Sequence, residues 1–236
     1  MIRYELDTSD IVSSDADDTL DLLRDAQAVW SSLFQGMAPV GDWLQARIAC
    51  LVRDWIGGDW QISHGQVFDP ANRNLQSRSW DLIIHRRPPD DYALPDGSTL
   101  PPAATASGPW VLLPKHLCAA VIDTKGRYDA PRIYAAAPAL NPRNDSTIPQ
   151  LELLAPDIRP ALLILASTRK PVTVMREGEQ HHLPTFVVAQ AIDHKGSHGT
   201  ERVTWEVART ANGTLPLDDF RTYIIESVRA WHARNQ

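Results

Sequence analysis

Cysteine is scarce in this sequence. Cys50 and Cys118 are its only two cysteines, and each lies inside an apolar stretch. This usage is not typical of a secreted fold held together by disulfides, nor of a zinc site built on several thiolates. Both residues are predicted to be small core side chains in a reducing compartment.

Long apolar runs are also missing. No stretch approaches the roughly 18 residues that a membrane-spanning helix needs, and no basic leader precedes an apolar segment. Apolar residues nevertheless make up 43% of the 236 residues and charged residues 22%, which is enough to build a normal core. The sequence therefore predicts one α/β or α+β domain over 1–236, cytoplasmic and without a membrane partner.

Lysine is the rarer cation, with four lysines against nineteen arginines. Because arginine is the usual cation in this sequence, each lysine is a candidate for a specific role. The lysine ammonium is a compact charge that suits contact with a nucleophilic water or a phosphate.

Acidic residues are concentrated at the start of the chain. The net charge is −6, and residues 1–25 alone carry that charge, so residues 26–236 sum to zero. We interpret 1–16 as an acidic arm, and a neutral body remains compatible with a local basic groove.

Periodicity predicts the secondary structure. Helical spacing of apolar residues marks 17–35, 42–56 and 217–233. Strand-like runs cover 61–69, 79–87, 110–126, 160–167, 185–193 and 201–209, and the last two are expected to form a hairpin. Two segments are expected to lack strands: the polar connector after 69, and the loop 88–109, whose six prolines cannot pair in a sheet.

The stretch "CAAVIDTKG" contains an aspartate and a lysine two residues apart at the end of an apolar run. Side chains two apart on a strand point the same way, so Asp123 and Lys125 share a face. If 79–87 and 117–125 are neighbouring strands, Asp81 can converge on the same point. Carboxylates there would bind Mg²⁺, with Mn²⁺ as an alternative and the Thr124 carbonyl as a further ligand, and Lys125 would position a water or stabilise developing charge.

By itself, Asp-x-Lys is a weak pattern, because an ion pair at a strand end looks the same. The chain contains a second copy, Asp193 and Lys195. We favour the first copy because Asp81 also stands at the head of an apolar strand.

The segments "GQVFDPANRNLQSRSWDLIIHRR" and "WVLLPKHLCAAVIDTKG" resemble the PD-(D/E)xK nuclease superfamily, and more closely the NucC-type endonucleases of cyclic-oligonucleotide antiphage defence. The resemblance implies an α/β fold with a restriction-endonuclease-like core, a mixed central β-sheet flanked by helices. It implies that Asp81 and Asp123 are metal ligands and Lys125 the catalytic lysine. Gln45 stands where the family usually has a helix glutamate, and an amide brings no charge to a metal.

The resemblance further implies a Mg²⁺-dependent endonuclease acting on double-stranded DNA, activated by a cyclic oligonucleotide, and assembled as a homo-oligomer, a trimer or a multiple of one. Two alternatives stay open: a nuclease-fold binding or regulatory protein weakened in catalysis, and an RNA-cleaving or site-specific relative.

Several cations and histidines flank the proposed site in the sequence. His64 and His85 are expected to be hydrogen-bonded structural residues. Four arginines near the proposed site have two equally weighted interpretations: they contact phosphates, or they are solvated residues at strand ends. These are Arg73, Arg78, Arg86 and Arg127.

Overall fold

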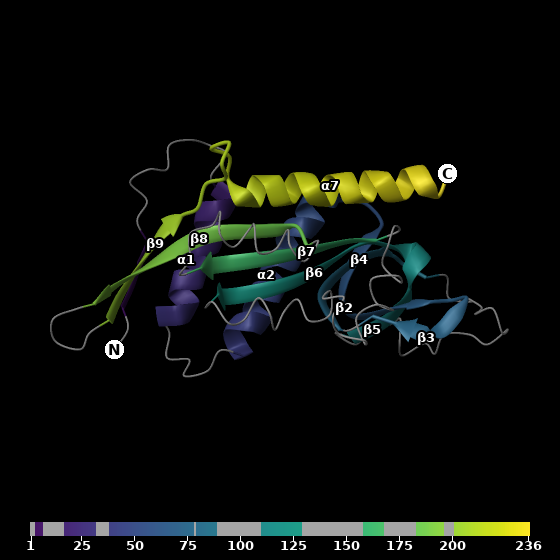
Figure 1. Ribbon diagram of the computed structural model, residues 1–236, viewed down its shortest axis with the longest axis horizontal. Helices are drawn as coiled ribbons and strands as arrows, with labels where there is room; N and C mark the ends of the chain where they lie inside the picture. Colours follow the sequence, from purple (N-terminus) through teal and green to yellow (C-terminus); the bar gives the residue numbers. More distant parts are fainter. Residues whose placement is uncertain are drawn as a thin grey trace. The chain divides into compact units, whose positions relative to one another are not determined.

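The structure is a computed structural model that describes residues 3–6, 17–31, 38–77, 79–88, 110–128, 158–167, 183–195 and 201–236. Figure 1 labels its elements: β1 (Arg3–Leu6), α1 (Asp17–Ser31), α2 (Ala38–Ile56), β2 (Trp60–Asp69), β3 (Asn72–Gln76), β4 (Trp80–Arg86), β5 (Trp110–Pro114), β6 (Cys118–Tyr128), β7 (Arg159–Ser167), β8 (Thr185–Lys195), β9 (Glu201–Val207) and α7 (Pro216–Arg234). A short 3₁₀ turn, η2 (Lys115–Leu117), joins β5 to β6. The predicted proline-rich loop lies outside the described residues except for Pro88.

The chain divides into two compact units. The first contains 1–51, 124–135 and 162–222, and the second contains 52–123, 136–161 and 223–236. Four elements, α2, β6, β7 and α7, contribute residues to both. The single domain expected over 1–236 stays a prediction.

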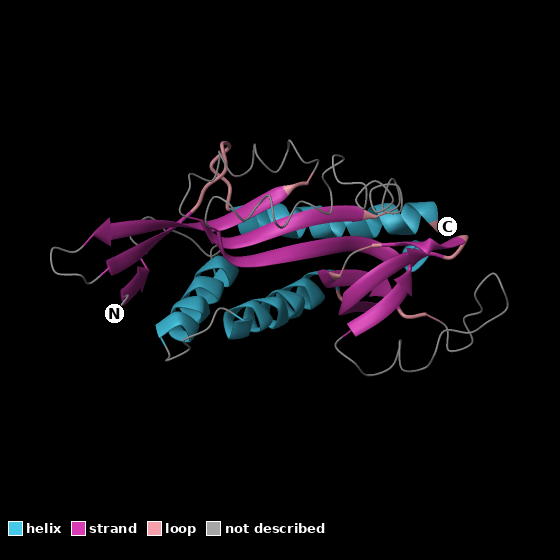
Figure 2. Ribbon diagram, turned by 60° about the horizontal axis from the view of Figure 1, so that its bottom comes forward, coloured by secondary structure: helices cyan, strands magenta, loops and turns pink. Residues whose placement is uncertain are grey.

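The predicted apolar face is buried in α2, whereas α1 buries a face shifted from the predicted one, on which Leu20 and Val29 are only half-buried. Leu22, Leu23 and Ala26 of α1 are buried, as are Leu44 and Ile48 of α2. Figures 1 and 2 show α1 and α2 side by side. An ion pair of 3.0 Å between Asp25 and Arg47 joins the two helices.

The strands of the first unit follow the order β1-β9-β8-β7. The β8–β9 pair is antiparallel, which confirms the predicted hairpin, whereas β1 pairs with β9 and β7 with β8 in parallel. β1 lies within the segment that we expected to be an acidic arm, and its pairing with Arg202 to Trp205 was not foreseen. The apolar run of β7 is buried from Ala161 to Ser167, as expected for a strand covered on both faces.

The strands of the second unit follow the order β6-β4-β2-β3, with β5 on β2. The β2–β5 pair is parallel and the others are antiparallel, so each unit mixes both kinds of pairing. Together with the flanking helices, this confirms the predicted mixed α/β architecture.

We expected the polar connector after β2 to be a loop. Instead, Asn72–Gln76 forms a strand, β3. Ser77 closes this hairpin: its buried hydroxyl accepts a hydrogen bond from the Val67 N–H at 2.9 Å, and its own N–H donates to the Val67 carbonyl. Backbone and hydroxyl groups thus hold this hairpin closed at Ser77.

Gly65 lets β5 lie against β2. Its φ is +149°, and a Cβ at this position would overlap the backbone of Val111. Only glycine can adopt this conformation and leave space for the neighbouring strand.

The C-terminal half of α7 is fastened to the second unit by two long-range hydrogen bonds. The Tyr223 hydroxyl donates to the Pro160 carbonyl, and the Trp231 indole N–H donates to the His116 carbonyl, each over 2.8 Å. Burial raises the pKa of Tyr223 above its ordinary value, so the hydroxyl remains a donor.

The two cysteines differ. Cys118 is buried, as predicted, and burial raises the pKa of its thiol to well above the ordinary value. Cys50 is exposed on α2, so its assignment to the core was wrong: the apolar stretch around it is one side of a helix, and Cys50 lies on the other. Across the described ranges, no helix is long and apolar enough to cross a membrane.

Candidate metal centre

The proposed site begins with the antiparallel pairing of β4 and β6. Leu82 pairs with Ile122 and Ile83 with Val121, so Asp81 and Asp123 each come one residue beyond the Leu82–Ile122 pair. The predicted pairing of these two strands is confirmed. That Asp81 and Asp123 form one site stays a prediction.

A β-bulge occurs at Asp81. On the other side of β4, Ser63 of β2 pairs with Ile83 while Gly65 pairs with Trp80. β4 therefore has one residue more than β2 over this interval, and Asp81 and Leu82 both stand against His64. Bulges redirect side chains and are frequent beside active sites. The sequence carries no signal for this bulge, because it arises only when the two strands are paired.

The environment of the two carboxylates suits a divalent cation. Asp123 is 4% exposed and Asp81 is half-buried. A divalent cation held by carboxylate oxygens would offset part of the cost of burying the charge of Asp123.

The donor set also fits magnesium. Within the described segments, no group of three or more histidine, cysteine, aspartate or glutamate side chains is arranged to hold a metal ion. Zinc sites use three or four such ligands. Magnesium is commonly held by one or two carboxylates and keeps several waters, so a pair of aspartates fits it.

Lys125 follows Asp123 on β6 and projects to the same side of the strand by alternation. It is half-buried, and its ammonium donates a hydrogen bond of 3.1 Å to the Thr124 carbonyl. That carbonyl therefore already accepts from Lys125, and its predicted role as a metal ligand requires its second lone pair.

The second Asp-x-Lys copy has a different setting. On β8, Asp193 pairs with Val203 of β9 and Lys195 pairs with Glu201. No carboxylate is opposite Asp193 in this register, whereas Lys195 has an acid opposite it. The side chains of Asp193, Lys195 and Glu201 lie outside the described residues, so the preference for the first copy stays a prediction.

The structure describes the side chains of some of the other predicted site residues and not of others. Gln45 is half-buried on α2 and its role stays a prediction. Arg73 and Arg127 lie on β3 and β6, but their side chains, and the whole of Arg78, lie outside the described residues. Arg86 is described, and it pairs with Asp59 at 3.2 Å.

His85 is the structural histidine that we expected. It is 2% exposed, its Nδ1 lies 2.9 Å from the Arg86 carbonyl, and its Nε2 lies 3.0 Å from the Ser63 hydroxyl. A carbonyl only accepts, so Nδ1 carries the proton and Nε2 accepts from Ser63. Burial lowers the pKa of His85, which keeps the ring neutral.

Lys115 has an ordinary explanation. It forms a 3.1 Å ion pair with Asp69, whose carboxylate also accepts the Ala71 N–H. Burial raises the pKa of Asp69, but these hydrogen bonds and the charge of Lys115 outweigh burial and hold that pKa below its usual value. This pair stabilises the β2–β3 turn.

Comparison with solved structures identifies the fold. P. aeruginosa ATCC27853 NucC in its cAAA-bound form matches with a TM-score of 0.55 and 13% identity, over 94% of this chain and 98% of that chain. E. coli MS115-1 NucC in its cAAA-bound form matches with a TM-score of 0.52 and 11% identity, over 98% of this chain and 100% of that chain. No protein-family model matches the sequence, and no curated protein matches it. The chain therefore has a NucC-like, restriction-endonuclease-like fold, as the sequence predicted.

Proposed function

We propose that this protein is a metal-dependent endonuclease that hydrolyses phosphodiester bonds in double-stranded DNA. The observation that carries the proposal is the antiparallel pairing of β4 with β6, whose pair Leu82–Ile122 comes one residue before Asp81 and Asp123. The NucC-like fold supports the proposal.

In this proposal each residue has a distinct task. Asp81 and Asp123 hold Mg²⁺, or Mn²⁺ in its place, through carboxylate oxygens. When bound by these residues, such an ion would supply a water of lowered pKa and would neutralise phosphate charge. Lys125 orients the attacking water or stabilises charge that develops on the phosphate oxygens, and its hydrogen bond to the Thr124 carbonyl restrains the ammonium near the strand. Half-burial of Lys125 strengthens that interaction relative to water.

Regulation and assembly belong to the same proposal. Both NucC structures compared above are cAAA-bound forms. By analogy with that fold, we propose that a cyclic oligonucleotide activates this chain, that it acts as a homo-oligomer, and that it serves antiviral defence in the cytoplasm. These points rest on the analogy of fold alone.

Digestion of plasmid DNA tests the proposal. The protein is incubated with Mg²⁺, Mn²⁺ or EDTA, each with and without cAAA and other cyclic oligonucleotides, and parallel reactions use RNA. We expect DNA cleavage that requires the divalent ion and rises with one cyclic oligonucleotide. Cleavage in EDTA would contradict the metal centre, and cleavage of RNA alone would favour the RNA-cleaving alternative. Light scattering after size exclusion measures the assembly.

A second candidate, a nuclease-fold binder that does not cut, is favoured by one observation. The described residues supply two carboxylates and no third acidic or histidine ligand, and Gln45 would add no charge. Titration calorimetry with Mn²⁺ distinguishes the two functions. Saturable binding that disappears in Asp123→Ala supports the nuclease, and the absence of any binding supports the binder.

A further inference from the structure

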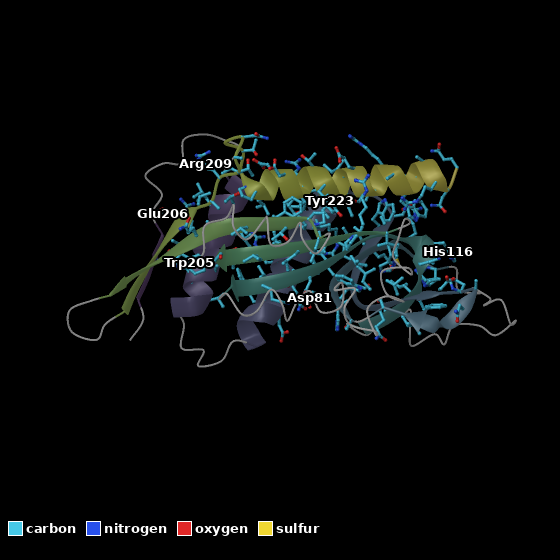
Figure 3. The ribbon with its side chains drawn as sticks, viewed as in Figure 1. Asp81, His116, Trp205, Glu206, Arg209 and Tyr223 are labelled. Carbon is cyan, nitrogen blue, oxygen red and sulfur yellow. The ribbon has the colours of Figure 1, made fainter. Side chains whose placement is uncertain are left out.

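The chain that leads into Asp81 runs along β2 with two residues more than β2 has over the same interval. Asp81, labelled in Figure 3, is the second residue of β4. Val67 of β2 is hydrogen-bonded to Ser77, and further along the same two segments Ser63 pairs with Ile83. β2 thus advances by four residues, from 67 to 63, while the chain beside it advances by six, from 77 to 83.

The two extra residues enter at separate places. Gly65 pairs with Trp80, and this pair divides the interval so that one extra residue lies on each side of it. On one side is the bulge at Asp81 that was described above. On the other side, between Ser77 and Trp80, is a second bulge, which we call the Ser77 bulge. The Ser77 bulge precedes Asp81 along the chain, so it sets the register in which β4 begins.

Side chains replace the backbone bond that the Ser77 bulge interrupts. Two hydrogen-bonded residues of a regular antiparallel pair exchange both of their N–H to carbonyl bonds. Here the Ser77 N–H donates to the Val67 carbonyl at 2.7 Å, as in a regular pair. The Val67 N–H, however, donates to the Ser77 hydroxyl at 2.9 Å, and the Ser77 carbonyl accepts from the Gln66 side-chain amide at 3.0 Å. The hydroxyl and the amide thus satisfy the two backbone groups that the bulge separates.

Burial makes these two hydrogen bonds specific for the position of the bulge. Ser77 is 2% exposed and Gln66 is half-buried. A buried backbone N–H without an acceptor is costly, so the ladder can be interrupted where a hydroxyl and an amide replace the missing bond. If the extra residue moved along the strand by one position, the side chains that it passed would turn to the opposite face of the sheet.

We propose that Gln66 and Ser77 are positioning residues for the metal centre: they fix the Ser77 bulge, and the bulge fixes the face of the sheet on which Asp81 lies. This inference rests on the function proposed above, in which Asp81 is a metal ligand. Neither side chain contacts the metal or the substrate in this proposal, since both act through Asp81. If they only stabilised the β2–β3 hairpin, their loss would lower stability and leave metal binding and kcat unchanged.

The test removes each hydrogen bond separately from the full chain. Ser77→Ala removes the acceptor hydroxyl, and Gln66→Met removes the donor amide while it keeps the length of the side chain. Titration calorimetry with Mn²⁺ gives the metal affinity and plasmid cleavage gives kcat, both well below the melting temperature of each variant. We expect the Mn²⁺ affinity to fall about ten- to a hundredfold and kcat to fall with it, as for loss of a group that orients a metal ligand.

Two further variants examine whether the residues act together. Ser77→Thr keeps a hydroxyl and should retain most of the affinity and of kcat. The double variant Gln66→Met/Ser77→Ala should lose little more than Ser77→Ala alone. Both residues hold the same bulge, and effects on one hydrogen-bond network are not additive.

Thr185 of β8 provides the matched control. It is buried, and its hydroxyl donates a 2.9 Å hydrogen bond to the Leu183 carbonyl. Thr185→Val therefore removes a buried hydroxyl that bonds to the backbone in a strand without either proposed metal ligand. It should leave Mn²⁺ affinity and kcat at the wild-type values even if the melting temperature falls.

The outcomes separate this inference from the proposed function. If the wild-type chain binds Mn²⁺ and cuts DNA, and either Ser77→Ala or Gln66→Met behaves like Thr185→Val, the pair is structural and the inference is wrong while the nuclease function stands. If the wild-type chain neither binds Mn²⁺ nor cuts, the proposed function fails and the inference fails with it.

Discussion

Leu82 of β4 pairs with Ile122 of β6, and Asp81 and Asp123 each come one residue beyond that pair. Asp123 is also buried. A buried carboxylate next to a second one is the kind of donor set that we propose for a divalent cation.

Replacing Asp123 with alanine is expected to remove activity and preserve folding. Cleavage should fall at least about a hundredfold, because the several kcal/mol that a bound ion contributes to the transition state are lost. The free energy of unfolding should stay within about 1 kcal/mol of wild type or rise, since a repulsion is relieved. Plasmid cleavage and urea unfolding measure the two effects. The control is Asp193→Ala in the second Asp-x-Lys copy, and equal loss of cleavage in both variants would contradict the assignment.

Replacing Lys125 with alanine should slow cleavage and leave metal binding in place. We expect a loss of about a hundred- to a thousandfold in kcat, as for removal of one electrostatic stabiliser, with Mn²⁺ binding retained in calorimetry. Lys195→Ala should cut at the wild-type rate, because Lys195 lies on β8, opposite Glu201 of β9, and not on the β4–β6 pair. Loss of Mn²⁺ binding in Lys125→Ala would show that the lysine acts on the structure of the site instead.

Replacing Gly65 with alanine should destabilise the second unit. The new Cβ would meet the Val111 backbone at a φ of +149°, so β5 must move away from β2. The expected loss exceeds about 1 kcal/mol in denaturant unfolding. Gly41→Ala on α2 is the matched control, because nothing lies within 4 Å of its Cβ position. That variant should gain about 0.5–1 kcal/mol from helix propensity, and similar changes in both variants would exclude the steric explanation.

Burial of His85 predicts a dependence of stability on pH. Its pKa in the folded state is lowered by burial, so below the ordinary value of about 6.5 the unfolded chain binds more protons than the folded one. Stability should therefore be full above pH ~6.5 and fall as the pH drops through the folded-state pKa, by up to about 1.4 kcal/mol per pH unit. Burial also lowers the pKa of His116, which acts in the same direction.

Denaturant unfolding between roughly pH 7 and pH 5 measures this effect. His85→Asn should be less stable at neutral pH, having lost the bonds to Ser63 and the Arg86 carbonyl, and should show a shallower decline with acid. An unchanged decline in His85→Asn would assign the pH dependence to other groups.

Local pattern determined most of the elements. Strict apolar periodicity identified the three helices, the apolar run of β7 and the β8–β9 hairpin, because a helix or strand with one buried face needs that spacing whatever it packs against. β1 and β3 escaped prediction since their sequences are polar. Backbone hydrogen bonds to β9 and the Ser77 contacts hold them, and neither has a signature in local composition.

For the candidate site, the sequence by itself determined that Asp123 and Lys125 share one side of a strand, because strand side chains alternate with a period of two. Only the tertiary structure decided that β4 is the neighbour of β6 and that Leu82 pairs with Ile122, one residue before Asp81 and Asp123. Pairing of β4 with β2 produced the bulge against His64, and packing of α7 placed Trp231 against Trp60. Register and packing depend on contacts between segments far apart in the chain, and a one-residue slip would have moved Asp81 to the other face.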